Sequence, residues 1–156
     1  MFTVDASVHI NAMNPAEPGS ADSQAFIEQL HQRPWAVFSP TLLLVEVAAA
    51  VARATNNTGR GIAMAQAVHG LPGQIWITLD DSLTEEAIQL ATEHRLRGAD
   101  AVYAAVAQRH GTTLVTWDRQ QLSRLQSILP VLTPTTALER AAKPVKAARP
   151  NASQHH

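Results

Sequence analysis

Short β-branched or aromatic runs alternate along the chain with longer segments in which apolar residues recur every three or four positions. The short runs predict strands at residues 2–5, 36–39, 75–78, 113–116 and 130–133. The longer segments predict helices near residues 20–32, 41–56, 59–70, 82–96, 100–110, 119–127 and 135–142. Strands that alternate with helices are typical of β-α units, so the pattern predicts an α/β fold with a parallel sheet.

The length of 156 residues predicts one compact domain, residues 1–139, followed by a basic, flexible C-terminal tail, residues 140–156. The tail carries four cations and no acid, which leaves eight cations against thirteen acids in the rest of the chain. No apolar run approaches the roughly 18 residues of a membrane span, and the N-terminus lacks the features of a signal peptide. Because the chain has no cysteine, it has no disulfide and no thiolate metal site. We therefore expect a cytoplasmic protein with an acidic body.

Two aspartates follow predicted strands, at the sheet edge where ligands bind in open α/β folds. Asp5 ends the first strand and Asp118 follows the fourth. Each has an ordinary alternative, because aspartate is also a common cap of the helix or turn that comes next. Ser7 and Thr116 place a hydroxyl near these acids, available either to a shared ligand or to the local backbone.

Glu46 is the only charged residue of the segment PTLLLVEVAAAVA, residues 40–52. At helical spacing its neighbours are apolar, so the side chain does not lie on an obviously solvated face. A carboxylate in such surroundings costs several kcal/mol unless a partner stabilises it. The alternative is an ordinary solvated position on the helix surface. This explanation is weaker for Glu46 than helix capping is for the aspartates.

Asp100 opens a helix whose next residues, 101–107, are nearly all small and apolar. Capping and the helix dipole are the ordinary explanation of an acid in the first turn. A helix so rich in alanine is nevertheless expected to pack tightly in the core. Its N-terminus would then place Asp100 in the interior of a site rather than in open water.

Four acids that converge on one cleft cannot all stay ionised at close range without a cation. Oxygen ligands without cysteine suit Mg²⁺ or Mn²⁺. Such an ion polarises a phosphoryl oxygen and lowers the pKa of a bound water, which is the chemistry of phosphodiester hydrolysis. The candidate catalytic and metal-binding residues are therefore Asp5, Glu46, Asp100 and Asp118.

Other polar features have simpler explanations. Asp80 and Asp81 also follow a strand, but they are expected to form the entry to a helix in which Ser82 and Glu85 make a capping box. The histidines lack the paired spacing of a zinc site, although His9 is close enough in sequence to Asp5 to border the cleft. The arginines that flank the two later acids are expected to be solvated, with phosphate or protein contacts as the alternative: Arg95, Arg97 and Arg119.

In their order and context, four features of the chain resemble a PIN domain, in particular the VapC-type toxin ribonucleases of bacterial toxin–antitoxin pairs. These are FTVDAS near the N-terminus, the isolated Glu46, LRGADAVYAAVAQRHG and TLVTWDRQQL. The resemblance extends from about residue 2 to about residue 135. It implies a three-layer α/β/α sandwich with a central parallel sheet, and a Mg²⁺- or Mn²⁺-dependent endoribonuclease.

The resemblance also implies site residues and partners. The family's acidic quartet falls on the four acids named above, with Ser7 and Thr116 as supporting hydroxyls. A toxin of a type II pair implies RNA as substrate, a small antitoxin protein as partner, and a homodimer that buries part of the helical surface. Some relatives have a further acid shortly after the last aspartate, whereas Arg119 follows Asp118 here, which leaves one metal or two open.

Two other functions fit parts of the pattern. Phosphoryl transfer to an aspartate uses a lysine, and the only lysines, Lys143 and Lys146, are in the tail. A non-catalytic PIN-fold interaction module is the main alternative to a nuclease. Four acids kept in one cleft argue against it, because they repel one another unless they bind something. Metal dependence distinguishes the two.

Overall fold

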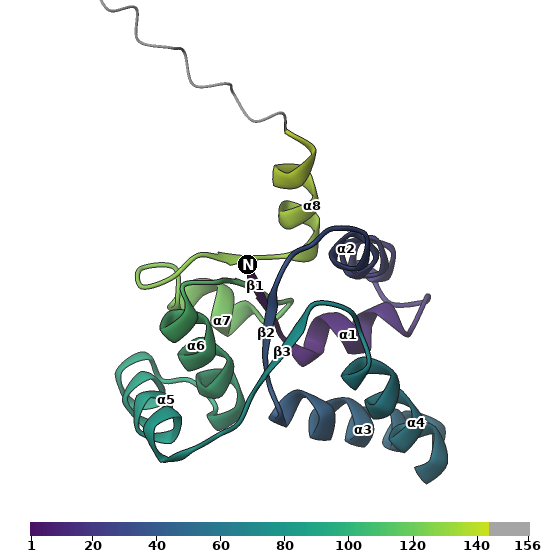
Figure 1. Cartoon of the computed structure of the whole chain (residues 1–156), viewed down its shortest axis with the longest axis horizontal. Helices are drawn as coiled ribbons and strands as arrows, with labels where there is room; N and C mark the ends of the chain where they lie inside the picture. Colours follow the sequence, from purple (N-terminus) through teal and green to yellow (C-terminus); the bar gives the residue numbers. More distant parts are fainter. Residues whose placement is uncertain (144–156) are drawn as a thin grey trace, which may run out of the picture.

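The computed structural model describes residues 1–143 and confirms the α/β prediction, with helices on both faces of a five-stranded parallel sheet (Figure 1). The strands are β1 (Phe2–Val4), β2 (Val37–Pro40), β3 (Gln74–Ile77), β4 (Thr113–Val115) and β5 (Val131–Leu132). Their order in the sheet is β3-β2-β1-β4-β5. From β1 the chain adds β2 and then β3 on one side, and it then crosses back to add β4 and β5 on the other side of β1. The direction in which strands are added therefore reverses between β1 and β4. Ligands of open α/β sheets bind at such a reversal, beyond the carboxyl ends of the strands.

The helices include all seven that the sequence predicts and one that it does not. They are α1 (Ala6–Ala12), α2 (Ser20–Gln32), α3 (Leu42–Thr55), α4 (Thr58–His69), α5 (Asp81–His94), α6 (Gly98–His110), α7 (Arg119–Arg124) and α8 (Pro134–Ala142). The unpredicted helix is α1, which has only seven residues. A helix this short is marginal alone, and packing against α2 and α3 stabilises it.

Side chains of the sheet alternate between two apolar clusters, one on each face. On one face the strand residues pack with Phe26 and Leu30 of α2 and with Ala137 of α8. On the other face Leu114 of β4 packs with α5 and α6. The strand residues of the first cluster are Val4, Val37, Val115 and Leu132. This two-residue alternation is what a sheet covered on both faces requires.

The helix α6 lies directly behind the centre of the sheet, as its composition predicts. Residues 101–107 are all buried, with exposed fractions of 6% or less. The alanines let this helix approach β1, β2 and β4 closely. The first turn of α6 is thereby held beside the carboxyl ends of β1 and β4.

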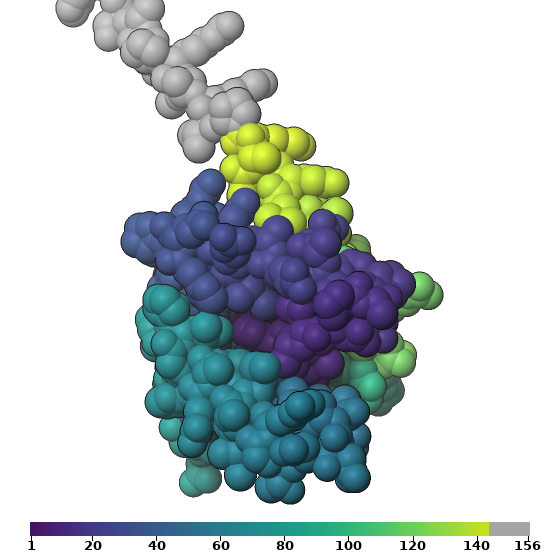
Figure 2. All heavy atoms as spheres, turned by 90° about the vertical axis from the view of Figure 1, so that its right-hand side faces the viewer, coloured from purple at the N-terminus to yellow at the C-terminus, as the bar shows by residue number. Residues whose placement is uncertain are grey.

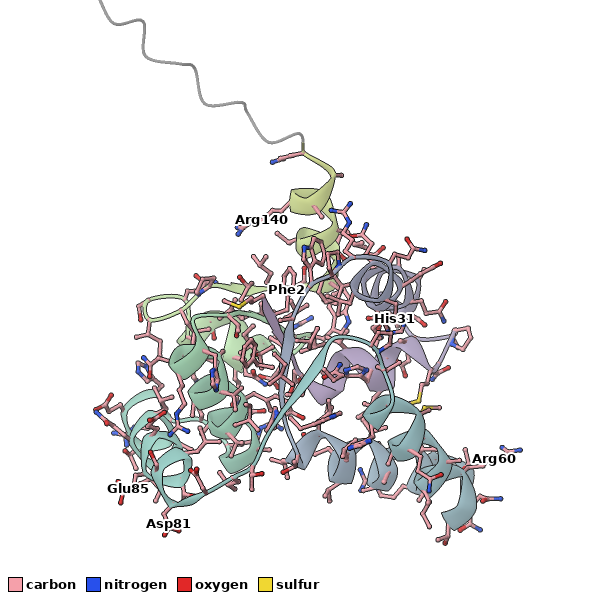
Figure 3. All side chains as sticks on the ribbon, viewed as in Figure 1. Phe2, His31, Arg60, Asp81, Glu85 and Arg140 are labelled. Carbon is pink, nitrogen blue, oxygen red and sulfur yellow. The ribbon has the colours of Figure 1, made fainter. Side chains whose placement is uncertain are left out.

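The start of α5 differs in detail from the prediction. Asp80 is the N-cap, and its Oδ1 accepts a hydrogen bond from the N–H of Leu83 over 2.8 Å. The predicted capping box of Ser82 with Glu85 is therefore wrong, because the helix begins earlier than expected. Figure 3 shows Glu85 at the outer surface of α5, pointing away from the rest of the molecule.

The helices α3 and α4 pack closely at Gly61. A Cβ atom added there would lie 2.6 Å from the carbonyl oxygen of Ala48 and 3.0 Å from Cβ of Ala52. Because the first contact is with backbone, α4 would have to move away from α3. Gly61→Ala is expected to lower the free energy of unfolding by about 1–3 kcal/mol, as overpacking does. Chemical denaturation measures this, with Gly59→Ala of the same helix as the control.

At Gly59 an added Cβ would meet only the side chain of Asn57, at 3.4 Å. That substitution is therefore expected to be neutral or slightly stabilising. Equal stability of the Gly59→Ala and Gly61→Ala variants would contradict the close packing of the two helices.

The predicted C-terminal tail is only partly within the described residues. Residues 140–142 complete α8, and residues 144–156 lie outside the described part of the chain. Within residues 1–143, no helix is both long enough and apolar enough to cross a membrane.

Candidate active site

Asp5 lies where β1 ends, beside the end of β4. Val4 pairs with Val115 in the sheet, so the residues that follow them, Asp5 and Thr116, meet at the same edge. Thr116 Oγ1 donates a hydrogen bond to Asp5 Oδ2 over 3.1 Å, and the N–H of Ser7 donates to the same oxygen over 3.2 Å. Asp5 is therefore both the N-cap of α1 and a buried carboxylate at the edge of the sheet.

Asp118 follows β4 and caps α7. Its Oδ1 accepts a hydrogen bond from the N–H of Gln121 over 2.9 Å, and its own N–H donates to Thr116 Oγ1 over 2.9 Å. The Thr116 hydroxyl thus connects the acids that follow β1 and β4. Ser7 adds a second link, because its Oγ accepts a hydrogen bond from the N–H of Trp117 over 3.1 Å. Capping explains part of the role of both aspartates, and it leaves both beside the same edge of the sheet.

Glu46 lies in the second turn of α3 and is half-buried. The hydroxyl of Tyr103 donates a hydrogen bond to Glu46 Oε2 over 2.5 Å. Tyr103 belongs to α6 and is fully buried. The partner that an apolar setting requires for this carboxylate is therefore a tyrosine from another helix.

Asp100 lies in the first turn of α6 and is 8% exposed. The side-chain amide of Gln121, a fully buried residue of α7, donates a hydrogen bond to Asp100 Oδ1 over 2.9 Å. Gln121 thus contacts two acids, through its side chain to Asp100 and through its backbone N–H to Asp118. This arrangement ties the start of α6 to the start of α7.

Arg97 bridges the same two acids from the solvent side. Its Nε lies 3.0 Å from Asp100 Oδ2, and its Nη2 lies 2.5 Å from Asp118 Oδ2. The arginine side chain is 67% exposed, whereas those of Asp100 and Asp118 are 11% and 20% exposed. Arg97 is therefore exposed to solvent, as expected, but it also pairs with two acids, which the sequence expectation did not include.

All four predicted acids line one cavity with a volume of about 470 Å³. They come from the ends of β1 and β4 and from α3 and α6, so residues distant in sequence share one site. Most of the remaining wall is apolar, apart from a hydroxyl and a guanidinium; it consists of Ala6, Ser7, Ile10, Arg97, Ala99 and Trp117.

His9 does not border this cavity, contrary to the sequence expectation. It is buried, with 5% exposure, and it is not among the lining residues. Ser7 and Ile10 line the cavity from α1, and His9 lies about 200° around that helix from Ser7. The spacing in sequence suggested proximity, but the unpredicted helix turns His9 away.

A larger hollow with a volume of about 920 Å³ adjoins the acidic cavity, and Ser7 and Ile10 line both. Its walls come mainly from α1, α3 and α4, and they are mostly apolar. Figure 2 shows the face that carries α1, in purple, between α2 above it and α4 below it. The four acids line the smaller cavity, and none of them lines the larger hollow.

A sequence profile of the PIN domain matches residues 2–128. The chain belongs to the PIN domain family. No curated protein sequence matches the chain significantly. The PIN domain prediction is therefore confirmed, and the matched segment contains every residue that lines the acidic cavity. PIN domains are typically metal-dependent nucleases.

Solved structures with the same fold include toxins and toxin–antitoxin complexes. The toxin VapC20 of Mycobacterium tuberculosis, described as cleaving the Sarcin-Ricin loop, is 18% identical with a TM-score of 0.65, over 76% of this chain and 91% of that chain. FitAcB from Neisseria gonorrhoeae is 19% identical with a TM-score of 0.63, and the match covers 86% of this chain and 99% of that chain. VapBC2 from Rickettsia felis, bound to a DNA fragment from its promoter, is 15% identical with a TM-score of 0.59. The match covers 83% of this chain and 96% of that chain. At these identities the likeness shows a shared fold.

Burial raises the pKa of two carboxyls in this PIN domain. The pKa of Glu46 is raised mainly by burial and further by the charges of Asp5 and Asp100, while the Tyr103 hydrogen bond and Arg97 oppose the rise. The pKa of Asp100 is also raised mainly by burial, and Arg97 opposes that rise. Because both shifts disfavour the ionised form, bringing a cation to the acids would lower the free energy of the site.

The donor set fits a hard divalent ion in its chemistry. All four acids line one cavity and offer only oxygen, which Mg²⁺ and Mn²⁺ prefer. Among residues 1–143, however, no group of three or more His, Asp or Glu side chains is arranged to hold a metal ion as it stands. Arg97 already pairs with two of the four acids, which is one reason why the carboxylates are not arranged around a metal position.

Sequence reasoning does not single out Tyr103 and Gln121, which position the acids. A weak signal was present for Tyr103, because a buried tyrosine in an alanine-rich helix needs a partner for its hydroxyl. Gln121 offers no such signal, since glutamine is usually exposed. Both depend on contacts between segments far apart in the chain, which one sequence does not show.

Proposed function

We propose that this PIN domain is a Mg²⁺- or Mn²⁺-dependent endoribonuclease that hydrolyses RNA phosphodiester bonds, and that it is the toxin of a type II toxin–antitoxin pair. The observation that carries the proposal is the gathering of Asp5, Glu46, Asp100 and Asp118 around one cavity. Four carboxylates there repel both one another and a phosphodiester, so the site is suited to its substrate only with a cation present.

Asp5, Asp100 and Asp118 are the residues that would hold the ion, directly or through water, and Glu46 would hold a second ion or orient the attacking water. When bound, the ion would supply the positive charge that polarises a phosphoryl oxygen and makes a nearby water more acidic. The supporting side chains restrict the carboxylates in advance. Ser7 and Thr116 donate hydrogen bonds to the Asp5 carboxylate at the end of β1. Gln121 donates a hydrogen bond to the Asp100 carboxylate at the start of α6.

Glu46 has a second property that suits proton transfer. Its pKa is raised by burial, so its carboxylate accepts a proton from water more readily than an exposed glutamate does. Tyr103 restricts the carboxylate through one oxygen, and the side chain still lines the cavity. With a single ion held by the three aspartates, Glu46 is the residue that we assign to accept the proton of the attacking water.

The proposed partner is a small antitoxin protein. Structures with the same fold include FitAcB and VapBC2, and another is described as a toxin–antitoxin complex from Klebsiella pneumoniae. The apolar hollow between α1, α3 and α4 adjoins the acidic cavity, so a bound segment there would lie beside the acids. A homodimer is also proposed, and the exposed side chains of Val45 on α3 and Ile62 on α4 offer an apolar surface for it.

The test is incubation of the purified protein with defined single-stranded and tRNA-like RNAs. Cleavage is expected with Mg²⁺ or Mn²⁺, and it should stop with chelator and in the Asp5→Asn variant. Cleavage that continues in both conditions would contradict the proposal. If no RNA is cleaved and neither ion raises the melting temperature, the non-catalytic interaction module is the correct interpretation.

A further inference from the structure

The oxygens of Asp100 and Asp118 are divided between two kinds of partner. Gln121 donates to Oδ1 of both acids, through its side-chain amide and its backbone N–H. Arg97 contacts Oδ2 of both acids, through Nε and Nη2. The two Oδ2 atoms are therefore the pair that a cation shares, and in this structure that cation is a guanidinium.

Three observations separate this contact from an ordinary structural ion pair. Arg97 is 67% exposed while its partners are mostly buried, so the guanidinium covers the acids from the solvent side. Although Arg97 is the N-cap residue of α6, its side chain makes no capping hydrogen bond to the backbone, and its contacts are with the two carboxylates. Arg97 is also the only cation that lines the cavity within residues 1–143, against four carboxylates.

The guanidinium also acts on the electrostatics of the whole cluster. It lies in the same cavity as Asp5 and Glu46, so its positive charge acts on these acids as well as on the two that it contacts. A guanidinium and a divalent ion would thus relieve the same repulsion. A divalent ion held by Asp100 and Asp118 would therefore compete with the guanidinium for these carboxylates.

We propose that Arg97 is an internal counter-cation, which neutralises Asp100 and Asp118 in the metal-free protein and has to leave their Oδ2 atoms before a divalent ion binds. The proposal rests on the metal-dependent function proposed above. It makes metal binding an exchange of one cation for another, in which the exposed side chain of Arg97 rotates toward solvent. Metal affinity is then set partly by the strength of the Arg97 contacts.

The test compares Arg97→Gln with wild type after removal of metal by chelator, with Mn²⁺ as the probe. Calorimetric titration is expected to show Mn²⁺ binding about tenfold more tightly to the variant, because no guanidinium has to be displaced. Without metal, the melting temperature of the variant is expected to fall by about 2–4 °C, because the acids lose their counter-charge. With saturating Mn²⁺ this difference should disappear.

Arg95→Gln is the matched control, since it removes the same charge two residues away. The Arg95 side chain is exposed and donates to the carbonyl of Thr92, not to the acids. Its Mn²⁺ affinity should stay within about twofold of wild type, as for a distant exposed charge. A variant at Arg97 that binds Mn²⁺ no more tightly than wild type overturns the proposal.

RNA cleavage separates this inference from the proposed function. If Arg97→Gln binds Mn²⁺ more tightly and no variant cleaves RNA, the counter-cation is supported and the ribonuclease is wrong. If wild type cleaves RNA with Mn²⁺ and the affinity of Arg97→Gln is unchanged, the ribonuclease is supported and the counter-cation is wrong. If wild type and variant both fail to bind Mn²⁺, both proposals are wrong.

Discussion

Asp100→Asn is expected to lower the rate of metal-dependent RNA cleavage by at least about 100-fold, because it removes a charge that acts on the reacting centre. The change keeps the size of the side chain, and an amide oxygen still accepts the hydrogen bond from Gln121. The fold should therefore be preserved, which circular dichroism checks. Single-turnover cleavage of a labelled RNA measures the loss.

Asp80→Asn is the matched control for this prediction. Asp80 also follows a strand and caps the next helix, but it is outside the acidic cavity. Asparagine caps a helix as well as aspartate does, so both stability and cleavage are expected to stay near wild type. Equal loss of cleavage in the two variants would mean that Asp100 has no special role.

His9 is expected to make the protein sensitive to acid. Burial lowers the pKa of His9 to about 4, with a smaller contribution from His31, so the folded state holds this side chain neutral. Since the unfolded chain binds the proton at its ordinary pKa of about 6.5, the stability from neutral His9 is present above pH 6.5. It is lost as the pH falls toward 4. The loss amounts to about 3 kcal/mol.

His9→Leu tests this directly. The variant removes the titrating group, and Nε2 of His9 has no hydrogen-bond partner within the described residues. Between pH 7 and pH 4, the free energy of unfolding of wild type should therefore fall by about 3 kcal/mol more than that of the variant. Denaturant unfolding at each pH measures the difference. His69→Gln, at an exposed histidine, should follow wild type, and parallel curves for wild type and His9→Leu would refute the assignment.

The arrangement of the acids was predictable because each stands out locally. Asp5 and Asp118 end strands, and the carboxyl ends of neighbouring parallel strands meet at one edge of the sheet. Glu46 interrupts an apolar helix, and Asp100 starts an alanine-rich one. Strand position and helix composition are properties of short segments, so one sequence carries them.

What remained hidden depends on contacts between distant segments. Tyr103 contacts Glu46 across 57 positions, and Arg97 contacts Asp118 across 21. The helix that carries His9 is too short to be read from periodicity, and packing against α2 and α3 stabilises it. Local patterns therefore located the acids, and tertiary packing decided which side chains position or neutralise them.

The most direct measurement of the central claim is the chemical form of the RNA ends after cleavage with Mn²⁺. Attack by water at the acidic cavity leaves linear phosphate and hydroxyl ends, whereas attack by the RNA's own 2′-hydroxyl leaves a 2′,3′-cyclic phosphate. Metal-dependent hydrolysis predicts linear ends that form only with the divalent ion and disappear in Asp100→Asn. Cyclic phosphate ends, or cleavage that persists in that variant, would contradict a metal-dependent hydrolysis carried by the four acids.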